Sequence, residues 1–278
     1  MRGHSLRYAV NLSILFTELD LLDRPAAAKA AGFDAVEFWW PFSTATPRAA
    51  EVDAFVGAVA DAGVQLAGLN FFGGDLPAGE RGVVSLPRRV DEFKASVDLA
   101  VEIGRRLNCP AFNALYGNRI DAASATEQDA VAIGSLRYAA KRVADIGATV
   151  LLEPVSGVPS YPLRTAADVI GVLDRVEAPN IGLLADLYHL SVNGDDVAGV
   201  IAAYTDRIAR VQIADAPGRG EPGSGELPFD EWLAALVANG YTGYVAAEYK
   251  PTVASADSFS GWFDAAGLMQ ASANTLEE

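Results

Sequence analysis

The chain has 278 residues, of which 51% are hydrophobic and 21% charged, so it carries enough apolar side chains for a large core and is not intrinsically disordered. Its formal net charge of -15 argues against nucleic acids and anionic membranes as partners, because a negative surface repels both. No apolar run reaches the roughly 18–20 residues that span a bilayer, and the single cysteine, Cys109, excludes a disulfide framework, so we expect a cytoplasmic protein.

The histidine content narrows the metal chemistry. The chain has two histidines, His4 and His189. His4 lies in residues 1–6, which we expect to be a disordered leader, and a single remaining imidazole cannot build a three-histidine zinc site. Any metal would therefore be held by oxygen ligands, which favours Mg²⁺ or Mn²⁺.

Eight apolar segments alternate with helical stretches along the chain. The apolar segments predict strands at Tyr8–Asn11, Ala35–Trp39, Gln65–Phe71, Ala111–Leu115, Thr149–Glu153, Ile181–Asp186, Ile208–Ala214 and Tyr244–Glu248. The stretches between them predict helices that include Arg48–Ala62, Arg89–Leu107, Glu127–Ile146, Arg164–Val176 and Phe229–Asn239. Four helix-to-strand joints carry a glycine where the left-handed conformation ends a helix, at Gly32, Gly63, Gly147 and Gly240.

This alternation predicts an α/β protein with a single (β/α)8 TIM barrel domain over residues 1–278. Each unit averages about 35 residues, which is ordinary for this fold. The rival fold, a doubly wound open sheet, normally has a glycine-rich phosphate turn after its first strand, and the segment after Asn11 has none. Residues from about 255 to 278 are expected to form a C-terminal helical segment.

Each predicted strand has a polar residue near its C-terminal end. These residues are Asn11, Glu37, Asn70, Asn113, Glu153, Asp186, Gln212 and Glu248. Residues two apart share one face of a strand, so we expect these side chains to point into the barrel at the rim where TIM barrels have their active sites.

Four of these residues, spaced by about one βα unit, form a tighter set: Glu153, Asp186, Gln212 and Glu248. Any one of them alone could be a strand-end cap or an ion-pair partner. Three carboxylates and an amide that converge at consecutive strand ends repel one another unless a divalent cation lies among them. The set therefore predicts a Mg²⁺ or Mn²⁺ site.

Several motifs resemble the hydroxypyruvate isomerase family of the xylose isomerase-like TIM barrels. The most distinctive is Val211-Gln-Ile-Ala-Asp-Ala-Pro-Gly-Arg-Gly-Glu-Pro-Gly-Ser-Gly-Glu226. Shorter matches are Leu76-Pro-Ala-Gly-Glu-Arg-Gly82, Leu152-Glu-Pro154, Asp186-Leu-Tyr-His189 and Glu248-Tyr-Lys-Pro251. The resemblance covers roughly residues 8–251.

The resemblance implies a role for each matched residue. Glu153, Asp186, Gln212 and Glu248 would be the metal ligands, with Glu153 and Glu248 also the catalytic pair. His189 and Arg219 would contact the substrate. The implied reaction converts hydroxypyruvate to tartronate semialdehyde through an enediolate.

Three basic residues in the rim loops are candidates for holding the carboxylate of a 2-oxo acid: Arg81, Arg219 and Lys250. Each could equally be a solvated loop charge. We add Asn70 to the substrate-binding candidates because it belongs to the polar ring. The aromatic residues after strands two and three, among them Trp39 and Phe71, either line the pocket or cap the barrel.

Two loops depart from the family's sequence pattern, so the resemblance specifies the substrate less well than it specifies the chemistry. Many family members have Glu-Pro-Ile-Asn where this chain has Glu153-Pro-Val-Ser156, and the loop after Asn70 lacks the usual proline. A 2-oxo-tetronate isomerase, a sugar epimerase and an inactive sugar-acid binding protein are the alternatives. Ketose 3-epimerases normally carry histidine at the position of Gln212, which weighs against that activity. The related repair endonucleases need several zinc-binding histidines and a basic face, and this sequence has neither. We expect a small-molecule partner, and a homo-oligomer is compatible with the sequence.

Overall fold

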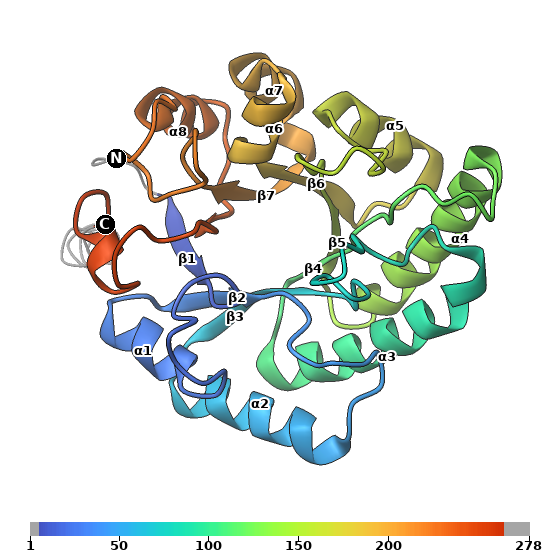
Figure 1. Cartoon of the computed structure of the whole chain (residues 1–278), viewed down its shortest axis with the longest axis horizontal. Helices are drawn as coiled ribbons and strands as arrows, with labels where there is room; N and C mark the ends of the chain where they lie inside the picture. Colours follow the sequence, from blue (N-terminus) through green and yellow to red (C-terminus); the bar gives the residue numbers. More distant parts are fainter. Residues whose placement is uncertain (1–5, 264–278) are drawn as a thin grey trace.

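The structure is a computed structural model in which residues 6–263 are described. Its eight parallel strands close into a barrel in sequential order, with β8 pairing with β1 (Figure 1). The strands are β1 (Arg7–Asn11), β2 (Ala35–Phe38), β3 (Gln65–Asn70), β4 (Ala111–Asn113), β5 (Thr149–Leu152), β6 (Ile181–Asp186), β7 (Ile208–Ile213) and β8 (Tyr244–Ala247). The predicted (β/α)8 barrel is confirmed.

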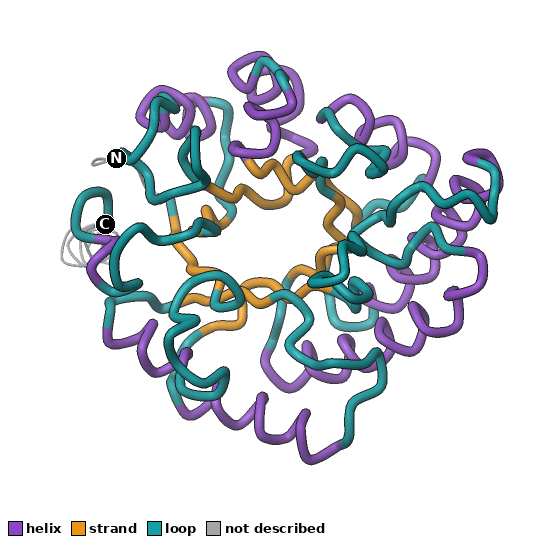
Figure 2. The backbone as a smooth tube through the Cα atoms, viewed as in Figure 1, coloured by secondary structure: helices purple, strands orange, loops and turns teal. Residues whose placement is uncertain are grey.

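Helices surround the barrel, as the purple tubes outside the orange strands show in Figure 2. The α-helices are α1 (Arg24–Ala30), α2 (Ala49–Asp61), α3 (Val90–Leu107), α4 (Ala125–Ala144), α5 (Ala166–Val176), α6 (Leu187–Asn193), α7 (Val197–Tyr204) and α8 (Phe229–Ala238). Short 3₁₀ helices are η1 (Pro87–Arg89), η2 (Thr205–Arg207) and η3 (Asp257–Phe259).

Local chemistry sets where several helices begin and end. Ser124 caps α4 by accepting the Glu127 N–H at 3.2 Å, and α5 begins with a reciprocal cap between Thr165 and Asp168. All four glycines predicted to end helices have positive φ, between 65° and 95°. The helices named from the sequence match α2, α3, α4, α5 and α8 to within two residues.

The barrel interior is layered. Apolar side chains form two clusters inside it, one of Ala9, Ala35, Ala67 and Ala246 and one of Ala111, Leu151 and Leu184. All eight polar residues predicted for the rim are buried. Glu153 and Glu248 each lie one residue beyond the end of their strand, so they are at the rim and not within the ladder.

Both ends of the described chain modify the predictions. Leu6 is 2% exposed and belongs to the core, so the predicted leader over residues 1–6 is wrong at Leu6; residues 1–5, with His4, lie outside the described residues. From the predicted C-terminal helical segment, residues 255–263 are described; they contain η3, and the Phe263 ring stacks on Phe33 at 4.1 Å. None of the helices in residues 6–263 combines the length and hydropathy needed to cross a bilayer.

Candidate active site

A cavity of about 440 Å³ opens at the C-terminal ends of the strands. The described residues that line it are Trp39, Asn70, Leu76, Pro77, Arg81, Leu115, Glu153, Val155, Ser156, Gly157, Val158, His189, Arg219 and Glu248. A larger hollow is lined by Thr149, Ile181 and Ile208, the first residues of β5, β6 and β7, so it lies at the opposite end of the barrel. Six of the nine predicted site residues line this cavity at the rim, and Asp186, Gln212 and Lys250 are not among its described lining residues.

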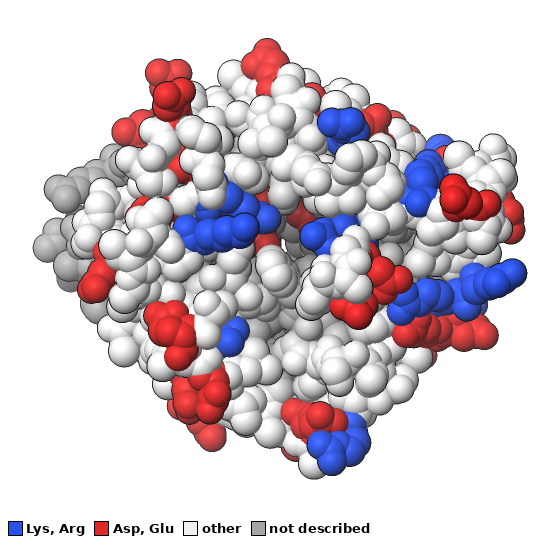
Figure 3. All heavy atoms as spheres, in the orientation of Figure 1, with Lys and Arg blue, Asp and Glu red and all other residues white. Residues whose placement is uncertain are grey.

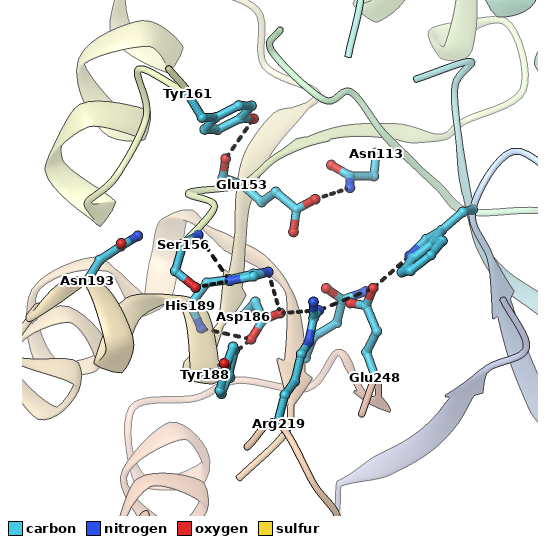
Figure 4. Close-up of polar contacts among 12 residues, drawn as sticks. Asn113, Glu153, Ser156, Tyr161, Asp186, Tyr188, His189, Asn193, Arg219 and Glu248 are labelled. Carbon is cyan, nitrogen blue, oxygen red and sulfur yellow. Dashed lines mark hydrogen bonds and ion pairs between the residues drawn. The ribbon is translucent and has the colours of Figure 1, made fainter. Parts of the chain in front are cut away.

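The two predicted catalytic glutamates face this cavity from different strands and have different hydrogen-bond donors. Glu153 Oε1 accepts from Asn113 Nδ2 at 2.8 Å, and Glu248 Oε1 accepts from Trp39 Nε1 at 2.6 Å. Figure 4 shows both side chains pointing towards the region that Asp186 and Arg219 also face. Each carboxyl is therefore held in one orientation by a neighbour that belongs to another strand or loop.

The surroundings of both glutamates favour their protonated forms. Burial, and after it the negative charge of Asp186, raise the pKa of Glu153 to about 7, although the hydrogen bond from Asn113 opposes the change. Burial also raises the pKa of Glu248 well above its ordinary value, against the lowering effect of Arg219. Carboxyls that bind and release a proton near neutral pH are suited to general acid–base chemistry.

Asp186 connects the end of β6 to the rest of the site. Its Oδ1 caps α6 by accepting the backbone N–H groups of Tyr188 at 2.9 Å and His189 at 3.2 Å. Its Oδ2 lies 3.5 Å from Arg219 Nη2 and 3.6 Å from His189 Nε2. The cap orients the carboxylate, which leaves Oδ2 facing the two predicted substrate contacts.

His189 is neutral in these surroundings because burial lowers its pKa to about 4 despite the opposing charge of Asp186. The Ser156 backbone N–H donates to His189 Nδ1 at 3.1 Å, and the Ser156 hydroxyl lies 2.7 Å from the same nitrogen (Figure 4). The ring proton is therefore on Nε2, the nitrogen that lies 3.6 Å from Asp186 Oδ2.

Arg219 brings positive charge into the carboxylate cluster. Its Nη2 lies 3.5 Å from Asp186 Oδ2 and 3.6 Å from Glu248 Oε1. Burial lowers its pKa, but the three carboxylates of Glu248, Asp186 and Glu153 outweigh this effect, and the pKa is raised. The guanidinium is 18% exposed and stays charged.

The other predicted substrate-binding residues divide into two groups. Asn70 and Arg81 line the cavity, and Arg81 Nη1 donates to the carbonyl oxygens of Leu76 at 3.0 Å and Glu80 at 2.6 Å. Lys250 is exposed and is not among the described residues that line the cavity; its backbone N–H donates to Arg219 O at 2.7 Å. The structure thus brings Arg81 and Arg219 to the cavity and leaves the Lys250 side chain outside it.

The donor chemistry of the four predicted metal ligands fits a hard divalent cation. Three are carboxylates, and the fourth, Gln212, has a buried Oε1 that accepts no hydrogen bond from the described residues. Such an unpartnered acceptor is costly unless a cation or donor binds to it. Within residues 6–263, no three His, Cys, Asp or Glu side chains already converge as a ligand cluster, so metal ligation by this set stays a prediction.

Sequence reasoning missed three features of the site. Arg210 is buried in the barrel and pairs with Glu37 at 2.7 Å; its position two residues before Gln212 on one strand was the available signal. Ser156 contacts His189, and Trp39, one of the aromatic residues predicted either to line the pocket or to cap the barrel, lines it and also donates to Glu248, whereas Phe71 lies in the core. The last two contacts join loops from different strands, which no local pattern specifies.

Comparison with known proteins identifies the family. Residues 25–271 match the family model for the xylose isomerase-like TIM barrel. The chain belongs to this family. This confirms the resemblance drawn from the motifs.

Curated relatives extend over nearly the whole chain. A Streptomyces coelicolor protein, provisionally named a hydroxypyruvate isomerase, is 51% identical over 93% of this chain and 96% of its own length. The hydroxypyruvate isomerase of Escherichia coli K12 is 32% identical over 88% of this chain and 94% of its own length, and the 2-oxo-tetronate isomerase of Pectobacterium atrosepticum is 31% identical, with coverages of 92% and 96%. The chain is therefore an enzyme of the isomerase class.

A solved structure agrees with the fold. A Brucella melitensis protein described as an AP endonuclease of family 2 superposes with a TM-score of 0.83 at 31% identity, covering 92% of this chain and 97% of that one.

Proposed function

We propose that this isomerase interconverts hydroxypyruvate and tartronate semialdehyde. The observation that carries the proposal is the pair of buried glutamates, Glu153 and Glu248, which face one cavity and are each held by a separate donor. A proton shift between adjacent carbons requires a general base and a general acid, and two carboxyls with raised pKa values can serve as both.

The reaction moves one hydrogen from C3 to C2 of the three-carbon acid. One glutamate removes a proton from C3, which gives an enediolate, and the other delivers a proton to C2. The C3 hydroxyl loses its proton and becomes the aldehyde oxygen, while the C2 oxygen gains a proton, so the atoms balance. The Nε2–H of neutral His189 is available to donate to a substrate oxygen during this exchange.

We assign the cation site to Glu153, Asp186, Gln212 and Glu248, with Mg²⁺ or Mn²⁺ as the ion. When bound, such an ion stabilises negative charge on the substrate oxygens and makes the C–H proton more acidic. The unpartnered Gln212 Oε1 supports this assignment.

Arg81 and Arg219 are the proposed partners of the substrate carboxylate. Both line the cavity, and a guanidinium pairs well with a carboxylate. An anionic substrate needs such help to enter a protein with a net charge of -15. In Figure 3, blue Lys and Arg atoms flank a central hollow on two sides, and red Asp and Glu atoms lie within it.

A four-carbon 2-oxo acid is the second candidate substrate. The cavity volume of about 440 Å³ lies within the usual range of small-molecule pockets, roughly 300–1,000 Å³, and has room beyond a three-carbon acid. The similarity to a 2-oxo-tetronate isomerase also supports this candidate.

A substrate panel in D₂O tests the proposal. Purified protein with Mg²⁺ or Mn²⁺ is given hydroxypyruvate, 2-oxo-tetronate, D-fructose and DNA with an abasic site. We expect deuterium at C2 of the product, the highest kcat/KM with hydroxypyruvate, and loss of turnover with a chelator that either metal reverses. A higher kcat/KM with 2-oxo-tetronate would select the second candidate, and exchange with neither 2-oxo acid would reject both, leaving a binding protein or another activity.

A further inference from the structure

Glu37 and Arg210 form an ion pair in the barrel interior that the proposed reaction does not use. Glu37 is on β2 and Arg210 on β7, and Arg210 Nη1 lies 2.7 Å from Glu37 Oε1. The two side chains are 5% and 3% exposed. A buried ion pair gives little net stability compared with apolar residues of similar size, so stability alone does not account for this one.

The second oxygen of Glu37 binds the predicted metal ligand Gln212. Glu37 Oε2 accepts from Gln212 Nε2 at 3.1 Å. A carboxylate paired with an arginine has no proton to donate, so only the nitrogen end of the amide can face it. The amide oxygen must therefore point away from Glu37, and this Oε1 is the buried acceptor without a partner among the described residues.

The interior of the barrel holds this arrangement on several sides. Arg210 Nη2 donates to the carbonyl oxygen of Ala67, and its guanidinium lies 5.3 Å from the centre of the Tyr244 ring. At position 68, a Cβ would come within 3.0 Å of Glu37 Oε1, so Gly68 leaves the space that the carboxylate occupies. The ion pair thus has a defined position in the barrel interior.

Strand register places Gln212 beside the carboxylate cluster. Gln212 pairs with Asp186 on β6 and with Ala246 on β8, two residues before Glu248. We propose that Glu37 and Arg210 are positioning residues that fix the Gln212 amide with its oxygen towards the cluster, as an acceptor for a cation. The proposal rests on the proposed function for the identity of that cation only; the orientation of the amide stands on the hydrogen bonds.

The test removes both charges together, because a single substitution would leave a buried charge unpaired. The double variant Glu37→Met/Arg210→Met is compared with Arg210→Lys, which perturbs the same site but keeps the carboxylate of Glu37. Two quantities are measured in each folded protein: the ¹H–¹⁵N resonances of the Gln212 side-chain amide, assigned by their loss in Gln212→Ala, and the affinity for Mn²⁺ alone.

In the double variant we expect the Gln212 Nε2 resonances to shift and the Mn²⁺ affinity to fall roughly 10- to 100-fold, the usual effect of losing a partner that orients a metal ligand. Arg210→Lys is the conservative variant: it keeps a positive charge beside Glu37, so both quantities should stay closer to the parent than in the double variant. The proposal would be overturned if the double variant kept the parent resonances of Gln212, or if these resonances shifted while its Mn²⁺ affinity stayed unchanged. If this double variant does not fold, Glu37→Gln/Arg210→Met, which also removes both charges, is judged by the same criteria, because the amide at position 37 would no longer dictate which end of Gln212 faces it.

Failure of the proposed function gives a different result. If the parent protein binds no Mn²⁺, the cation assignment is wrong, and the Gln212 resonances still decide whether Glu37 and Arg210 orient the amide. If the parent binds Mn²⁺ but does not turn over a 2-oxo acid, the reaction is wrong and both readouts remain valid.

Discussion

Glu153 illustrates how one residue is tuned by where its strand ends. It lies one residue past β5, where it is buried yet still reaches the cavity, and Asn113 on the neighbouring strand binds one of its oxygens at 2.8 Å. Burial and the nearby charge of Asp186 raise its pKa to about 7. The same surroundings that suit it to proton transfer therefore make its charged form unfavourable in the folded protein.

This predicts a pH-dependent effect of Glu153→Gln on the metal-free protein. The folded pKa lies above the ordinary value of 4.5, so the folded state holds the extra proton between about pH 4.5 and pH 7, and stability is lost as the pH rises through this window. Above pH 7 the substitution should stabilise the protein by up to about 3 kcal/mol, at about 1.36 kcal/mol per pKa unit. In the presence of a chelator, the melting temperature of Glu153→Gln should exceed that of the parent at pH 8, by roughly 2–4 °C per kcal/mol of stabilisation. At pH 5 the two proteins should differ little.

The control for this effect is Glu102→Gln, which removes the same charge from an exposed position on α3. This control separates the effect of removing a buried carboxylate from the effect of lowering the negative net charge of the protein. The melting temperature of Glu153→Gln is compared with that of the parent at each pH. If this difference is smaller at pH 8 than at pH 5, burial does not govern the pKa of Glu153.

Among the elements, the loop between β7 and α8 presents Arg219 to the cavity. Buried Asp215 organises it by accepting the backbone N–H groups of Ala216 at 2.8 Å, Gly223 at 2.8 Å and Leu227 at 3.0 Å. A side chain at Gly225 would overlap Ala216 O and Asp215 Oδ1. Arg219 itself has a φ of 60°, a conformation that the surrounding loop has to maintain.

Asp215→Asn should loosen this loop and weaken substrate binding. The new amide group would place N–H donors against the Gly223 N–H, which costs about 1–3 kcal/mol. If Arg219 holds the substrate carboxylate equally in the ground and transition states, KM should rise about tenfold or more with a smaller change in kcat. Steady-state kinetics would be compared with Asp196→Asn, an exposed cap of α7 remote from the cavity lining. An unchanged KM in a folded Asp215→Asn protein would contradict the assignment.

Helices and strands were predictable from the sequence where their residues follow a repeating local pattern. The helix-ending glycines and the polar residue at each strand end placed all eight units and brought Glu153, Asp186, Gln212 and Glu248 to one rim. Arg210 was predictable in principle, because alternation along β7 puts it on the face of Gln212. The contacts of Ser156 with His189 and of Trp39 with Glu248 depend on loop conformations that tertiary packing decides.

For the whole molecule, the question is how a protein with a net charge of -15 would bind the proposed anionic substrate. The closed barrel gathers carboxylates in the hollow and basic side chains beside it (Figure 3). Positive charge close to a partly enclosed site counts for more than distant surface charge, which salt screens over about 10 Å. The proposed isomerisation thus depends on the local arrangement and not on the average charge.

The most direct test of the account is turnover of hydroxypyruvate by Glu153→Gln, Glu248→Gln and the double variant, with metal occupancy measured alongside. Exposed Glu226→Gln in the β7–α8 loop is the control. Each single substitution should lower kcat roughly 10²–10⁴-fold, the contribution of a positioned general acid or base, and the double variant should be little worse than the poorer single one. If either single variant keeps its metal and turns over hydroxypyruvate at nearly the parent rate, the two-glutamate mechanism is wrong.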